Sequence, residues 1–90
     1  MSKLAAATER FPGRELEIHR LSARDPAFLA ICEDFAAALA ALDHWRAMGD
    51  RAAKRVEEYR TLVEELAAEV LAALDAQRRR SRPPHETGFD

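Results

Sequence analysis

Apolar residues recur every three or four positions in two long stretches of this 90-residue chain. In the first stretch they are Phe28, Ile31, Phe35, Ala38, Leu42 and Trp45. In the second they are Ala52, Val56, Tyr59, Val63, Leu66, Val70 and Ala73. A helix with 3.6 residues per turn places such positions along one side, so the pattern predicts two amphipathic helices, at about 26–48 and 50–78.

The residues between and before these stretches are typical of helix ends. Asp25 is expected to cap the first helix, and Pro26 suits the first helical position because its missing N–H is not needed there. Gly49 can take the left-handed conformation that ends a helix, and Asp50 is expected to cap the helix that follows. Arg46 lies in the last turn of the first helix, where a cation is favoured. So short a connection predicts antiparallel neighbours, which form a helical hairpin.

The remaining residues divide the chain into three parts. Residues 14–78 are predicted to form the hairpin domain, which includes a further short helix at 14–23. Residues 1–13 are expected to be a flexible N-terminal segment, since nothing in their pattern fixes where they pack. Residues 79–90 combine arginines, two prolines and a glycine with no apolar period, and we expect a disordered basic tail.

Two helices alone do not bury stripes of this width. The chain is small and holds many alanines, which favour helix but bury little area. Small domains often gain a larger core by oligomerising, so we expect a homodimer or a larger helical bundle. The association seam is predicted at Phe28, Ile31, Phe35, Leu39, Leu42, Trp45, Val56, Tyr59, Val63, Leu66 and Val70.

No group of residues predicts catalysis, a metal site or a cofactor. His44 has Asp43 beside it, but neighbouring residues of a helix point apart, and the three glycines are scattered rather than gathered in a phosphate loop. Cys32 is expected to be a small core residue. A single cysteine and the lack of any long apolar run are typical of a soluble cytoplasmic protein.

Two features leave a second interpretation open. Trp45 and Tyr59 lie at core spacing, but aromatic side chains near a helix tip also anchor protein partners. The basic residues Arg78, Arg79, Arg80 and Arg82 are candidates for contact with nucleic acid or an anionic membrane. The alternative interpretation of the arginines is that cations stabilise the negative end of the second helix.

The chain resembles the YdcH-like family of small uncharacterised bacterial helical hairpins. The resemblance covers roughly residues 16–75 and is carried by Ile18, Leu21, Asp25-Pro26, Phe28, Asp34-Phe35, Leu39, the run Tyr59-Arg60-Thr61-Leu62, Glu69-Val70 and Leu74. The alanine-rich AAALAALDHW departs from the polar middle that the family has in its first arm. The resemblance implies a helical hairpin and no catalytic residues.

Together these patterns predict an all-α protein without enzymatic activity. Its expected role is self-association or binding of another protein, whose identity the sequence does not give. The alternative is a nucleic-acid or membrane-surface accessory protein that uses the arginine-rich tail.

Overall fold

The computed structural model describes residues 3–81, in which four α-helices and one short 3₁₀ helix follow each other along the chain. The helices are α1 (Ala5–Arg10), α2 (Glu15–Arg24), α3 (Pro26–Arg46) and α4 (Ala53–Arg80), and the 3₁₀ helix is η1 (Gly49–Ala52). No strand occurs among these residues, so the all-α prediction is confirmed for this part of the chain. Within the same residues, no helix has both the length and the apolar character that crossing a bilayer requires.

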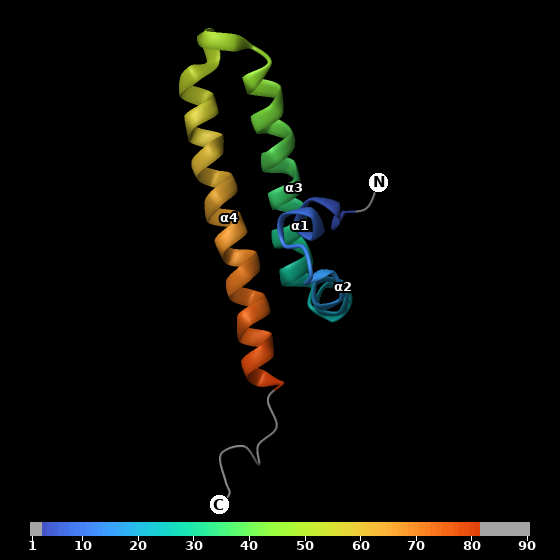
Figure 1. The fold of residues 1–90 in the computed structure, drawn as a ribbon. Coiled ribbons are helices and arrows are strands. Elements are labelled where there is room, and N and C mark those ends of the chain that lie inside the picture. Colours follow the sequence, from blue (N-terminus) through green and yellow to red (C-terminus); the bar gives the residue numbers. More distant parts are fainter. Residues whose placement is uncertain (1–2, 82–90) are drawn as a thin grey trace, which may run out of the picture.

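Helices α3 and α4 lie side by side and make the longest contact in the molecule, with η1 joining them at one end (Figure 1). Helices α1 and α2 pack against α3 and also reach α4. The buried side chains of all four helices form one core. Its largest fully buried members are Phe28, Phe35, Ile18, Leu74, Val70 and Cys32.

The start of α3 is fixed by the predicted cap. The Asp25 carboxylate accepts hydrogen bonds from the backbone N–H groups of Ala27 and Phe28, at 3.0 and 3.2 Å, and Pro26 occupies the first helical position. Asp25 itself is extended, as a residue before proline prefers, so α2 ends at Arg24 and the chain turns into α3.

The turn after α3 differs in part from the sequence prediction. Gly49 has a φ of 76°, the left-handed conformation expected of it. Asp50, however, lies inside η1 and caps neither η1 nor α4, since neither helix has a side-chain cap. The tight 3₁₀ turn places Ala52 rather than Asp50 immediately before α4, so the predicted cap at Asp50 is wrong.

The two ends of the chain also differ from expectation. Where the sequence predicted a flexible segment at 1–13, Ala5–Arg10 form α1, and Leu4 and Ala7 are buried in the core. Leu4 and Ala7 join the core and α1 packs against α3, a docking position that the sequence pattern did not indicate. Where a tail was predicted from residue 79, α4 continues to Arg80. The rest of that predicted tail, 82–90, lies outside the described residues.

Candidate association surface

The pair α3–α4 has two faces that differ in what covers them. The covered face carries α1 and α2, whose contacts to α4 include ion pairs to Glu64, Asp75 and Arg78. The open face lies on the other side of the pair. On α4, Leu62 lies on the open side, and Leu71 lies on the covered side beside Arg10 and Phe11. These leucines are nine residues apart, which is two and a half helical turns, so they point in opposite directions.

A groove of about 330 Å³ lies on the open face between the two helices. It is lined by Asp34, Ala37, Ala38, Ala41, Tyr59, Leu62 and Leu66, and no residue of α1 or α2 contributes to it. The alanines of α3 are too small to fill the space beside the larger side chains of α4. Leu62 is 38% exposed and Tyr59 and Leu66 are half-buried, so the groove presents apolar surface to the outside.

At the turn end, the open face continues into an aromatic and basic cluster. The guanidinium carbon of Arg55 lies 5.6 Å from the centre of the Trp45 ring, within the range of a cation–π contact. The His44 ring meets the same indole edge-on at 5.1 Å. Trp45, half-buried, also borders a second hollow of about 310 Å³ with the exposed Met48. Trp45 is therefore neither a core residue nor fully exposed.

The predicted association seam is split by this geometry. Five of its residues are already buried within one chain and have no surface left for a second copy: Phe28, Phe35, Leu42, Val63 and Val70. The other six are half-buried: Ile31, Leu39, Trp45, Val56, Tyr59 and Leu66. Of these, Tyr59 and Leu66 line the groove. The sequence pattern did not single out Ala37 and Ala41, because alanine gives no distinct periodic signal in an alanine-rich helix.

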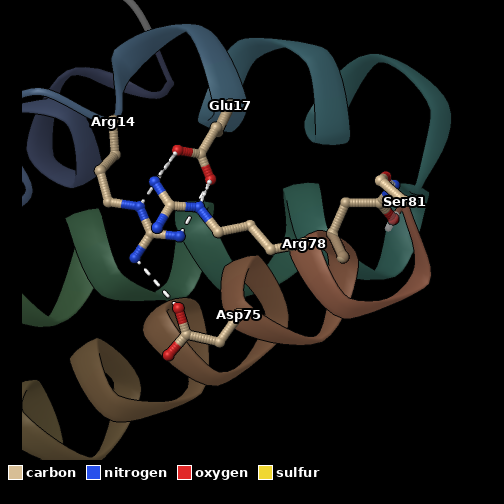
Figure 2. Close-up of polar contacts among 6 residues, drawn as sticks. Arg14, Glu17, Asp75, Arg78 and Ser81 are labelled. Carbon is tan, nitrogen blue, oxygen red and sulfur yellow. Dashed lines mark hydrogen bonds and ion pairs between the residues drawn. The ribbon is translucent and has the colours of Figure 1, made fainter. Parts of the chain in front are cut away.

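The covered face is held by a polar cluster that we call the clasp, formed by Arg14, Glu17, Asp75 and Arg78 (Figure 2). Arg78 of α4 donates to both oxygens of Glu17, from Nε at 3.0 Å and from Nη2 at 2.6 Å. Arg14 donates to the same carboxylate from Nη2 at 2.9 Å and to the Asp75 carboxylate at 3.1 Å. The clasp thus joins the start of α2 to the last turns of α4.

Electrostatics identify Glu17 as the centre of the clasp. Hydrogen bonds from Arg14 and then from Arg78 lower the pKa of Glu17 to about 2. Such a carboxylate stays ionised and fully engaged near neutral pH, which suits a structural tie and not a proton donor or acceptor. Arg14 is only 15% exposed, so little water competes for its side chain. We therefore assign the clasp to fold stability.

The arginines predicted as anion contacts are partly engaged elsewhere. Arg78 is held by Glu17, and Arg80 donates a hydrogen bond to the side chain of Gln77 at 3.0 Å. Arg79 is exposed on the last turn of α4, and Arg82 lies outside the described residues. The bidentate contact of Arg78 agrees with a role in joining α4 to α2 rather than in binding a phosphate.

Cys32 is buried in the core, where burial above all, and also the nearby Glu33 charge, raises its pKa to about 11. A thiol of this kind is a poor nucleophile near neutral pH. Among residues 3–81, no three histidine, cysteine or acidic side chains converge as metal ligands. The open groove is thus the best-defined candidate site in the described part of the chain.

Comparison of the chain with known protein families, curated proteins and solved structures finds no match in any of the three. The resemblance to YdcH-like proteins therefore stays a prediction.

Proposed function

We propose that this protein is a non-enzymatic helical hairpin that self-associates, with the open faces of two copies covering each other. The observation that carries the proposal is the groove between α3 and α4, which leaves Leu62, Tyr59 and Leu66 accessible along one side. Leucine and tyrosine side chains gain free energy when a partner removes them from water. A second copy presents the same apolar face, so the two open faces form a symmetric contact to which each copy contributes the same residues.

The proposal includes a homodimer in the cytoplasm. The cytoplasmic location is supported by the single cysteine, which is buried and unpaired. The alternative role in binding nucleic acid or an anionic membrane is less favoured, because Arg78 is committed to Glu17 within the chain. Its test is the salt dependence of binding, which phosphate contacts make steep.

The test of self-association uses two leucines with equal exposure. Leu62 and Leu71 are each 38% exposed, but only Leu62 lines the groove. We would replace each with lysine, which keeps helix propensity while placing a charge on the surface. Sedimentation velocity over a wide concentration range would give the mass, and circular dichroism would confirm that each variant stays helical.

We expect the unmodified chain to approach the mass of a dimer as its concentration rises. The Leu62→Lys variant should remain a folded monomer, whereas Leu71→Lys should associate like the unmodified chain. A fully helical chain that stays monomeric at every concentration would overturn the proposal. Loss of association in Leu71→Lys alone would also overturn it, because the contact would then lie on the other side of α4.

A further inference from the structure

The open face carries charges of opposite sign at its two ends. The turn end holds Arg51 and Arg55, which border one hollow together with Lys54 and Glu58, so that three cations there outnumber one acid. The other half holds Glu69 and Asp34. Arg51, Arg55, Glu69 and Asp34 are all exposed. Among residues 3–81, neither Glu69 nor Asp34 takes part in an ion pair. Each copy thus brings a basic end and an unpaired acidic half to the same face.

The spacing of these charges along α4 is symmetric about the groove. Arg55 lies seven residues before Leu62, and Glu69 lies seven residues after it. Seven residues are almost two full turns, so all three side chains share one side of α4, and each step covers about 10 Å along the axis. A face with opposite charges at equal distances from its centre is complementary to a copy of itself turned end to end.

Building on the proposed self-association, we infer that two copies pack with their open faces together and their long axes opposed, about a two-fold axis beside Leu62. This arrangement places Arg55 of each copy opposite Glu69 of the other, while the two Leu62 side chains meet at the centre. Two identical ion pairs then flank one apolar contact, the pattern of a self-complementary interface.

The same axis gives a consistent contact along α3. Ala38 lines the groove at the level of Leu62, and its small side chain allows two α3 helices to approach closely. Ile31 and Trp45 lie seven residues before and after Ala38, so each Trp45 faces Ile31 of the other copy. Both side chains are half-buried in one copy and become covered in the pair.

The opposite arrangement, with both turns at the same end, has no such complementarity. It gathers Arg51 and Arg55 of both copies at one end and both pairs of Asp34 and Glu69 at the other. Like charges brought together in this way oppose association. Arg55 remains free to bridge in the opposed arrangement, because its present contact to Glu58 is a long 3.4 Å pair on an exposed surface.

A cysteine cross-link reads the orientation directly. We would mix one chain carrying Arg55→Cys with a second carrying Glu69→Cys, oxidise mildly, and measure intact masses. The opposed arrangement brings these two positions together, so the mixed disulfide should form. Each variant alone should form none, because its two cysteines lie about 21 Å apart across the axis, beyond disulfide reach. The buried Cys32 is the internal control, since the unmodified chain should not cross-link.

Charge exchange gives a second, independent test in solution. Arg55→Glu turns two attractive contacts into repulsive ones and should raise the dimer Kd about tenfold. The double variant Arg55→Glu/Glu69→Arg restores opposite charges and should return the Kd to within about threefold of the original. The single and the double variant both lose the contacts that Arg55 makes with Trp45 and Glu58. Recovery of the Kd in the double variant therefore reports the contact between copies.

The outcomes separate this inference from the proposed function. A chain that never dimerises overturns both. A dimer that Leu62→Lys dissociates, but that gives no mixed disulfide and no recovery in the double variant, overturns the orientation alone. A disulfide in Arg55→Cys by itself would also overturn it, because it would place the two turn ends together.

Discussion

The two faces of the α3–α4 pair differ in how much of their apolar surface the chain itself covers. Phe28 and Phe35 of α3 are fully buried in the core that all four helices share. On the open face, three alanines of α3 leave a groove beside Tyr59, Leu62 and Leu66. The first face is covered by the chain itself, and on our proposal a second copy covers the second.

The means of closure also differ. Helices α1 and α2 have six and ten residues, too few to be stable as isolated helices, so their order depends on docking. Ion pairs join them to the longer helices at several points: Lys3 to Glu33, Arg10 to Glu64, Arg14 to Asp75 and Glu17 to Arg78. The open face has charges of both signs, and on our proposal Arg55 and Glu69 pair between copies.

The largest expected difference is in folding stability. Phe35 is fully buried in the core that the four helices share, so Phe35→Ala should lower the free energy of unfolding by about 3–5 kcal/mol. Leu62→Ala removes a partly exposed side chain and should cost about 1 kcal/mol or less in dilute, monomeric protein. Urea unfolding followed by circular dichroism measures both. Equal losses would mean that the two faces contribute alike to the fold, and the comparison would fail.

The features that could be predicted from the sequence are the local ones. The periodic apolar positions predicted helices at 26–48 and 50–78, and α3 and α4 occupy Pro26–Arg46 and Ala53–Arg80. The cap at Asp25 and the positive φ at Gly49 follow from single residues and their neighbours. Each of these features depends on contacts within one or two turns.

The contacts that determine which face the N-terminal helices cover could not be predicted in this way. Glu17 and Arg78 are 61 positions apart, and no spacing rule connects them. The stripe on α3 is wide enough to meet α1, α2 and α4, and its pattern does not say which side the N-terminal helices cover. The predicted seam therefore mixed core residues such as Phe35 and Val70 with groove residues such as Tyr59 and Leu66.

The next largest effect is the contribution of the clasp to folding stability, which we expect to depend on pH. Glu17→Gln removes the charge that two arginines share and should lower stability near neutral pH by about 1 kcal/mol, since the site is partly exposed. The pKa of Glu17 is about 2 in the folded chain, below its ordinary 4.5. Its contribution is thus complete above about pH 4.5 and is lost as the pH falls towards 2.

Urea unfolding at several pH values from 6 to 2 tests this dependence. The stability difference between the unmodified chain and Glu17→Gln should shrink steadily below about pH 4.5. Glu57→Gln is the matched control, because Glu57 pairs with Arg60 three residues along the same helix and joins no other element. A difference that stays constant down to pH 2 would show that Glu17 contributes by shape and not by charge.

The smallest expected effect is a change in the alkylation rate of Cys32, the single cysteine of the chain, which reports opening of the covered face. Cys32 is buried in the core that the four helices share and its pKa is raised to about 11, so alkylation near pH 8 requires this core to open, and we expect the short N-terminal helices to open first. Arg10 of α1 holds Glu64 of α4 through two hydrogen bonds, at 3.0 and 2.7 Å. An exposed pair of this kind is weak because water screens it, so Glu64→Gln should raise the alkylation rate only slightly, by about twofold. Leu62→Lys leaves the covered face untouched and should not raise this rate at a concentration where both proteins are monomeric. If Leu62→Lys raised the alkylation rate of Cys32 as much as Glu64→Gln does, the two faces would open as one unit. The groove would then contribute to the stability of the fold rather than to association.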